Sequence, residues 1–243
     1  MNNSHLNNGG SIRLLAELRT RLIYAITVLF GSFAILMYFA NQLYTWLALP
    51  LLKFLPQGHL IATEIVAPFF VPFKLAFMSS VLLTVPFILY QVWAFISPAL
   101  YGHEKRMIWP FLLLSAGLFY AGIAFAYFVI FPMLFHFLAN VAPKGVILSP
   151  DISEYLDFTI KLLLVFGALF EIPIIMSLLI STGIVTREKF IKWRSYAIVG
   201  AFVIGMLLAP PDVFSQTLLA IPVWLLYEIG ILLSRVIKTK RNE

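Results

Sequence analysis

Six apolar segments alternate with shorter polar stretches along the chain. A helix needs about 20 mainly apolar residues to cross the hydrocarbon core of a bilayer. We predict transmembrane helices over residues 22–40, 69–96, 109–131, 157–180, 195–208 and 214–233. The pattern therefore predicts an all-α polytopic membrane protein with six spans in a single transmembrane domain, residues 1–243.

The polar stretches between these segments also carry structural signals. The last two segments are short and are joined by Ala209-Pro210-Pro211-Asp212. We expect the two prolines to end one helix and Asp212 to cap the next, because proline cannot continue a helix and Asp is a preferred N-cap residue. The stretch from Leu43 to Leu55 has an amphipathic pattern, which indicates a segment that lies along the membrane interface.

Composition supports the bilayer as the solvent. The chain is 61% hydrophobic and 12% charged, whereas soluble domains are about 45–50% apolar and about 25% charged. It has no Cys, and its four His are scattered. We find no nucleophile–base–acid set, phosphate-binding loop or metal-ligand spacing. The sequence therefore predicts a protein that is not an enzyme and has neither a cofactor nor a metal.

The basic residues predict an orientation. Thirteen Lys and Arg residues flank one side of the predicted spans: Arg13, Arg19, Arg21, Lys105, Arg106, Arg187, Lys189, Lys192, Arg194, Arg235, Lys238, Lys240 and Arg241. The other side has only Lys53 and Lys144, while Lys74 and Lys161 lie near outer helix ends and are expected to snorkel outward. The positive-inside rule then places both termini in the cytoplasm. This explains the net charge of +6 better than nucleic-acid binding does.

Two acidic residues stand at the predicted cytoplasmic face. Glu17 precedes the first span, and its spacing favours a helix-surface ion pair with Arg21 at i,i+4. The other interpretation is a carboxylate that binds a cationic partner. Glu104, in the loop between the second and third spans, is either a solvated charge or a second such carboxylate. Two carboxylates on one face could each bind a guanidinium in bidentate fashion.

One acidic residue is predicted to lie inside the membrane. Glu171 falls well within the fourth apolar segment, where a carboxylate costs at least about 2.5 kcal/mol on insertion scales. We interpret it as a site for a partner's polar group or for protons, and the alternative is a protonated group that stabilises helix packing. Pro173 frees backbone groups nearby and is expected to kink this helix. Gln216, early in the last span, could bond to a partner helix, although an interfacial position is the simpler interpretation.

Six segments of the chain together form a specific pattern: Glu17–Leu22, Tyr90–Phe95, Ser97–Leu100, His103–Arg106, Phe170–Pro173 and Gly205–Asp212. In these segments the chain resembles the TatC family, the multispanning receptor subunits of the twin-arginine protein translocase, and the resemblance extends from about residue 12 to residue 235. It implies a concave bundle in the bacterial cytoplasmic membrane. It also implies binding of twin-arginine signal peptides of folded cargo, assembly with single-span TatA-like and TatB-like subunits, self-association, and transport driven by the proton-motive force.

The resemblance also assigns residues. It implies that Glu17 and Glu104 bind the signal peptide, with Arg19 in the same cytoplasmic motif. Glu171 matches the buried glutamate of the family, which is linked to partner helices. Pro50 and Asp212 match functionally sensitive segments.

The chain departs from the family pattern at two positions. Leu14 stands where a His is frequent, and Ala209 stands where a Thr is common. The first departure bears on the polar network around Glu17, and neither removes an acidic site.

Two other classes of function remain to be weighed against a receptor. A proton-coupled small-solute transporter would use Glu171, but it predicts several polar residues at mid-membrane and an internal repeat. We find one strong intramembrane acid and no repeat. A purely structural membrane scaffold would need neither surface carboxylate. The residues alone support a membrane receptor or transporter, and the family resemblance favours the receptor.

Overall fold

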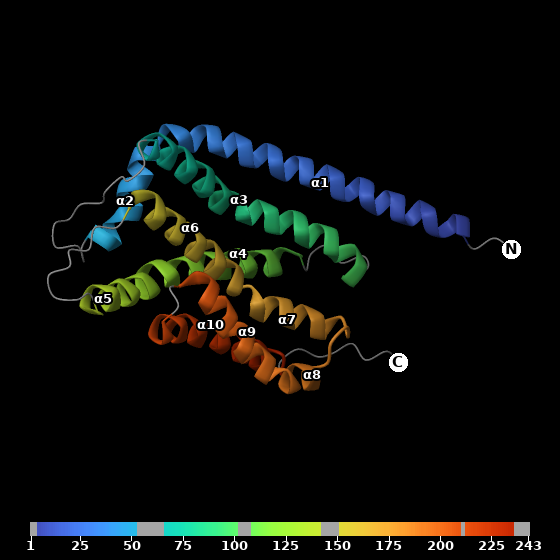
Figure 1. Cartoon of the computed structure of the whole chain (residues 1–243). Coiled ribbons are helices and arrows are strands. Elements are labelled where there is room, and N and C mark those ends of the chain that lie inside the picture. The colour runs from blue at the N-terminus through green and yellow to red at the C-terminus, as the bar shows by residue number, and fades with distance from the viewer. Residues whose placement is uncertain (1–3, 53–65, 102–107, 142–150, 210–211, 236–243) are drawn as a thin grey trace. The chain divides into compact units, whose positions relative to one another are not determined.

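The described chain is almost entirely helical. The computed structural model describes residues 4–52, 66–101, 108–141, 151–209 and 212–235 (Figure 1). Its helices, in chain order, are α1 (Ser4–Tyr38), α2 (Ala40–Leu52), α3 (Ala67–Tyr101), α4 (Ile108–Phe125), the π-helical turn η2 (Ala126–Ile130), α5 (Phe131–Val141), α6 (Ile152–Leu169), α7 (Ile172–Ser181), α8 (Arg187–Lys192), α9 (Arg194–Leu208) and α10 (Val213–Leu233). The all-α prediction is confirmed.

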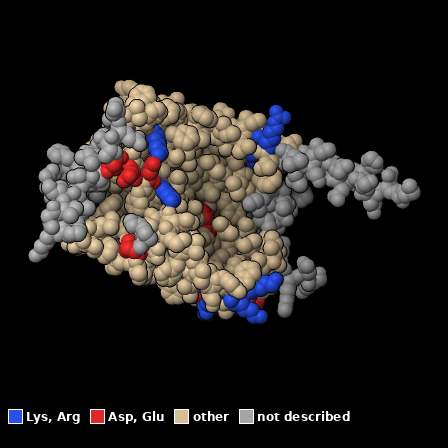
Figure 2. Space-filling view, in the orientation of Figure 1, with Lys and Arg blue, Asp and Glu red and all other residues tan. Residues whose placement is uncertain are grey.

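Within the described residues, five helical stretches are long and apolar enough to cross a membrane. They cover Ala16–Tyr38, Phe69–Phe95, Trp109–Leu138, Ile152–Ser181 and Val213–Leu233. Each corresponds to one of the predicted spans. The remaining predicted span coincides with α9, an apolar helix that is shorter than these five. On the face shown in Figure 2, the charged side chains of the described residues lie in a few groups among uncharged residues.

The chain forms two compact units. The first contains Met1–Leu43 and Pro72–Ala116, and the second contains Tyr44–Val71 and Gly117–Glu243. In the first unit α1 runs beside α3 (Figure 1), and Phe33 packs edge-on against Phe73 with 5.1 Å between the ring centroids. The most apolar window of α1 buries none of its residues within the chain. Apart from contacts such as that of Phe33 with Phe73, its apolar side chains are mostly exposed, as is typical of a helix that contacts lipid.

In the second unit, the predicted fourth span is broken into two helices. The helix α6 ends at Leu169 and α7 begins at Ile172. The break follows from Pro173, which has no N–H to donate to the carbonyl of Leu169 and whose ring crowds that carbonyl. Glu171 occupies the N-cap position of α7. The kink predicted from Pro173 is therefore present, within a helical stretch, Ile152–Ser181, that contains the predicted span over 157–180.

The third span is longer than predicted. Its helix passes through η2 and continues as α5 to Val141, whereas the predicted span ends at residue 131. Pro132 cannot donate a helical hydrogen bond. The backbone widens just before it, and the Phe131 N–H bonds to the Ala126 carbonyl, five residues back. The π-helical turn thus lets the helix continue past the proline.

Glycines allow close helix contacts in the second unit. A Cβ atom on Gly122 of α4 would lie 2.5 Å from the Phe166 carbonyl oxygen and 3.0 Å from the Cα of Gly167 on α6. A Cβ atom on Gly205 of α9 would lie 2.9 Å from the Gln216 carbonyl oxygen on α10. Small residues at such crossings are typical of membrane helices, whose association depends on close van der Waals packing.

Candidate functional site

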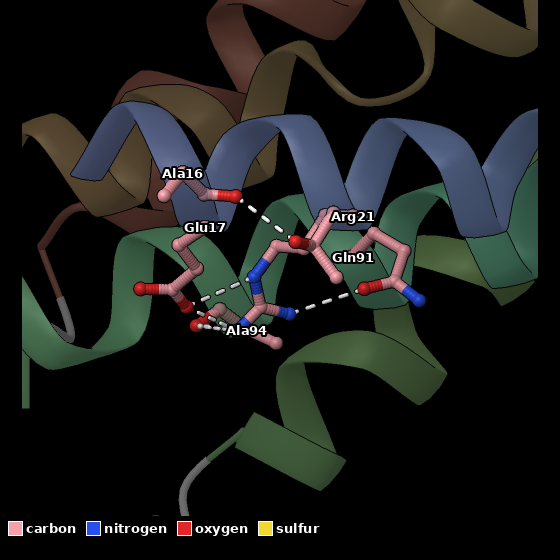
Figure 3. A network of polar contacts seen from close by, with 6 residues as sticks. Ala16, Glu17, Arg21, Gln91 and Ala94 are labelled. Atoms are coloured by element: carbon pink, nitrogen blue, oxygen red, sulfur yellow. Dashed lines mark hydrogen bonds and ion pairs between the residues drawn. The ribbon is translucent and has the colours of Figure 1, made fainter. Parts of the chain in front are cut away.

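The candidate site is built on an ion pair at the start of the first span. Glu17 and Arg21 are one helical turn apart on α1, with the acid N-terminal to the base, which is the favourable order. Arg21 donates from Nε and Nη2 to Oε1 of Glu17, at 3.0 and 2.6 Å. The helix-surface pair expected from the spacing is confirmed (Figure 3).

Arg21 also connects this pair to α3. Its Nη1 donates to Oε1 of Gln91 at 3.1 Å, and its Nη2 donates to the Ala94 carbonyl at 3.3 Å. Gln91 and Ala94 are three residues apart and therefore lie on the same face of α3. One guanidinium thus bonds to three groups on two helices, a geometry that suits the planar fork of Arg and not the point charge of Lys.

A surface pocket of about 370 Å³ surrounds the ion pair. It is lined by Glu17, Thr20, Arg21, Tyr24, Tyr90 and Gln91. Glu17, Thr20, Arg21 and Tyr24 recur at the three- and four-residue spacing that puts them on one stripe of α1. The pocket therefore offers both polar groups and aromatic surface where the first span begins.

One oxygen of Glu17 remains available in this pocket. Both bonds from Arg21 end on Oε1, and Oε2 accepts no hydrogen bond from the residues that the structure describes. Figure 3 shows Oε2 pointing away from Arg21, and the Glu17 side chain is 42% exposed. A carboxylate has about four acceptor sites. Glu17 can therefore accept further hydrogen bonds from a cationic ligand without losing Arg21.

The other residues predicted at the cytoplasmic face are only partly placed. Arg19 is exposed on α1 and makes no side-chain hydrogen bond within the described part of the chain. Glu104 lies outside the described residues. The prediction that Glu17 and Glu104 act together therefore stays a prediction. Leu14 belongs to α1, and its side chain is not among those described.

Glu171 is buried in the second unit. Its side chain is 8% exposed, at the break between α6 and α7. Its backbone carbonyl accepts from the N–H groups of Ile174 and Ile175, so it begins the hydrogen-bonding ladder of α7. The flanking residues Phe170 and Ile172 pack against a core cluster shared with α9 and α10. The carboxylate is therefore inside the helical stretch Ile152–Ser181, as the sequence predicts.

The remaining predicted site residues have structural roles or are not described in detail. Asp212 is the N-cap of α10, where its Oδ1 accepts from the Ser215 N–H at 2.7 Å, which confirms the predicted cap. Gln216 is half-buried, and its backbone carbonyl packs against Gly205. Pro50 belongs to α2, and its side chain is not among those described.

Sequence reasoning missed two features. Gln91 belongs to the segment Tyr90–Phe95, which resembles the TatC family, but nothing in its local pattern identifies it as a partner of Arg21. The ion pair between Arg194 and Glu228, with Nη2 and Oε2 2.7 Å apart, was also missed. Both contacts join residues that are far apart in the chain, and a single sequence carries no signal for them.

The network predicts how the site responds to a change at Arg21. In Arg21→Lys we expect a lower free energy of unfolding, by about 1 kcal/mol for each of the two lost hydrogen bonds to α3. The compact ammonium of Lys can keep the ion pair with Glu17 but cannot reach the two α3 acceptors at the same time. Thermal unfolding in detergent measures this effect. Arg19→Lys on the exposed side of the same helix is the matched control. Equal stability of the two variants would contradict the network.

Long apolar helices with a polar pocket at the start of one of them define the class of multi-span membrane receptors and transporters. Comparison with known proteins narrows this class. The family described as Sec-independent protein translocase protein (TatC) matches residues 13–222. The chain is 55% identical over 222 residues to the Sec-independent protein translocase protein TatC of Escherichia coli (strain K12), covering 91% of this chain and 86% of the relative.

Two further comparisons agree. The TatC protein of Haemophilus influenzae is 51% identical over 230 residues, which cover 94% of this chain and 90% of the relative. A crystal structure of a twin arginine translocase receptor, TatC, matches with a TM-score of 0.84 and 41% identity, over 92% of this chain and 99% of that chain. The chain therefore belongs to the TatC family, and it is a multi-span membrane component of protein transport.

Proposed function

We propose that the chain is the receptor subunit of a twin-arginine translocase in the bacterial cytoplasmic membrane. It crosses the membrane six times as a single transmembrane domain, with α9 as the short fifth span and both termini in the cytoplasm. The thirteen-to-two distribution of Lys and Arg supports this orientation. A short span is accommodated by local bilayer thinning or by helix tilt.

The receptor binds the two arginines of the signal peptide with carboxylates at its cytoplasmic face. The observation that carries this proposal is the geometry of Glu17. Its Oε1 is fixed by Arg21, its Oε2 points away from Arg21, and Glu17 itself lines the pocket on α1 and α3. A carboxylate that is already oriented loses less conformational entropy on binding. A guanidinium of the peptide therefore binds Oε2 while Arg21 retains Oε1.

Glu104 supplies the second carboxylate, and Arg19 belongs to the same cytoplasmic motif. Two guanidiniums of the peptide then have two acidic acceptors, and the apolar segment that follows them contacts the apolar helices. Arg21 has a second effect, since its positive charge opposes a badly placed arginine of the peptide. A protein gains specificity for one ligand by such repulsion as well as by attraction.

Glu171 serves the assembly of the translocase. We propose that its buried carboxylate, at the break between α6 and α7, accepts a polar group from a TatA-like or TatB-like single-span helix. Gln216 offers a further hydrogen bond to a partner helix, and the segments at Pro50 and Asp212 also contribute to function. Polar groups between membrane helices form bonds of about 1–2 kcal/mol in model peptides.

Glu171→Ala is expected to lower site-specific crosslinking to the single-span partners by about tenfold, because the partner's polar group then lacks its charged acceptor inside the membrane. Crosslinking yield in membranes measures this effect. Glu188→Gln, an exposed carboxylate on α8, is the matched control. Unchanged crosslinking and transport in Glu171→Ala would refute this role.

The proposed function is tested by export of a folded reporter with a twin-arginine signal from cells that lack their own receptor. We expect export only when this chain is supplied together with TatA-like and TatB-like subunits, and only with a proton-motive force. Normal export without the chain would favour a structural scaffold. Solute uptake into vesicles that contain only this chain would favour the proton-coupled transporter.

A further inference from the structure

A basic segment lies between α7 and α9 in the second unit. The short helix α8 (Arg187–Lys192) and the first residue of α9 contain Arg187, Lys189, Lys192 and Arg194, against one acid, Glu188. Lys189 and Lys192 are exposed. In Figure 2 basic side chains gather where Figure 1 draws α8. Because α8 lies between the apolar helices α7 and α9, this charge is placed where the chain leaves the membrane.

An apolar pocket opens next to the end of α8, where its lining residue Trp193 directly follows Lys192. It has a volume of about 390 Å³ and is lined by Trp193, Tyr196, Ala197 and Tyr227, with little polar surface. Trp193, Tyr196 and Ala197 recur at three- and four-residue spacing and therefore lie on one face of α9. Trp and Tyr are enriched at the level of lipid headgroups, and here they stand between the charged helix α8 and the apolar helix α9.

The pocket has walls that are fixed by polar contacts. The Tyr227 hydroxyl donates to the Phe190 carbonyl at 2.7 Å, which joins α10 to α8. Arg194 pairs with Glu228 at 2.7 Å, which joins the start of α9 to α10. Because Glu228 neutralises Arg194, the positive charge that remains beside the pocket belongs to α8. Lys189 lies one turn before Trp193, and its carbonyl accepts from the Trp193 N–H at 3.0 Å.

We propose that this corner of α8, α9 and α10 is a binding site for an anionic phospholipid of the bilayer. The phosphate binds Lys189 and Lys192, and an acyl chain occupies the pocket of Trp193, Tyr196, Ala197 and Tyr227. A single lipid molecule matches both features, since it combines a negative head with an apolar tail. The site uses only elements of the second unit and does not depend on the signal-peptide pocket on α1 and α3.

The test is native mass spectrometry of the purified full chain in detergent with equal amounts of phosphatidylglycerol and phosphatidylcholine that have the same acyl chains. We expect one phosphatidylglycerol to be retained in preference to phosphatidylcholine. In Lys189→Gln/Lys192→Gln this preference should fall by about fivefold for each charge removed, which is the usual contribution of a basic residue at an anionic surface. Arg19→Gln/Lys74→Gln, which removes two exposed charges from the first unit, should keep it.

A second set of variants distinguishes the contribution of the pocket to lipid binding from that of the charge. Ala197→Phe fills the pocket without changing any charge and should also release phosphatidylglycerol, whereas Val199→Phe, at an exposed position of α9, should not. Glycerol phosphate, which has the head without tails, should not compete. Equal binding of the two lipids would overturn the proposal, and so would equal competition by glycerol phosphate. Retained lipid in Ala197→Phe would mean that the pocket holds another occupant, such as a partner helix, and would overturn it as well.

Discussion

Replacing Glu17 and Glu104 together by Gln is expected to lower the affinity of the purified chain for a twin-arginine signal peptide by about a hundredfold. Hydrogen bonds to charged groups contribute about 1.5–3 kcal/mol each, which corresponds to at least about tenfold for each carboxylate. Gln retains the shape and one acceptor oxygen but removes the charge. The affinity is measured by titration of a labelled peptide into the detergent-solubilised chain.

The matched control for this double variant is Glu154→Gln. Glu154 is an exposed carboxylate in the first turn of α6, outside the pocket on α1 and α3. It should leave the affinity unchanged. If the double variant binds the peptide with unchanged affinity, neither carboxylate belongs to the recognition site. Each single variant should lose about tenfold, and a loss confined to Glu104→Gln would assign Glu17 a structural role with Arg21.

Gly122→Leu is expected to prevent stable packing of the second unit. Even a Cβ atom at this position would lie 2.5 Å from the Phe166 carbonyl oxygen, and the neighbouring atoms include backbone that cannot rotate away. Overpacking in a close-packed interior costs about 1–3 kcal/mol and sometimes more. We expect a lower melting temperature in detergent and a loss of monodisperse protein in size-exclusion chromatography.

Gly117→Leu is the control for this substitution. Gly117 lies on the same helix, α4, and a Cβ atom there would meet no described heavy atom within 4 Å. Because Leu is a better helix former than Gly by up to about 1 kcal/mol, this variant should be as stable as the unaltered chain or slightly more stable. Similar melting temperatures for the Gly122 and Gly117 variants would show that α4 and α6 do not pack as closely as described.

The sequence predicts well what depends on local pattern. Apolar runs of sufficient length locate five of the spans, and the shorter helix α9 coincides with the remaining one, predicted over residues 195–208. The i,i+4 spacing predicts the ion pair between Glu17 and Arg21, and the type of residue at Asp212 predicts the cap of α10. Each depends on residues within one or two helical turns, where geometry follows directly from the helix period.

Other features depend on contacts between distant segments. The bond from Arg21 to Gln91 joins residues 70 positions apart, so it depends on how α1 aligns with α3. The extension of the third span through η2 depends on the backbone accommodating Pro132, where a proline alone predicts a helix end. Lys161, expected only to snorkel, donates to the Leu207 carbonyl at the end of α9 at 2.6 Å.

The most direct test of the recognition site is photocrosslinking of a twin-arginine precursor to this chain with a photoreactive residue at position 17 and, separately, at position 104. The account predicts strong crosslinks from both positions, and their loss when the two arginines of the signal are replaced by lysines, which cannot form bidentate bonds. The exposed position 154 should give no crosslink. Crosslinks from position 154 as strong as those from 17 and 104, or equal crosslinks to the twin-lysine precursor, would contradict recognition of the arginines by these two carboxylates.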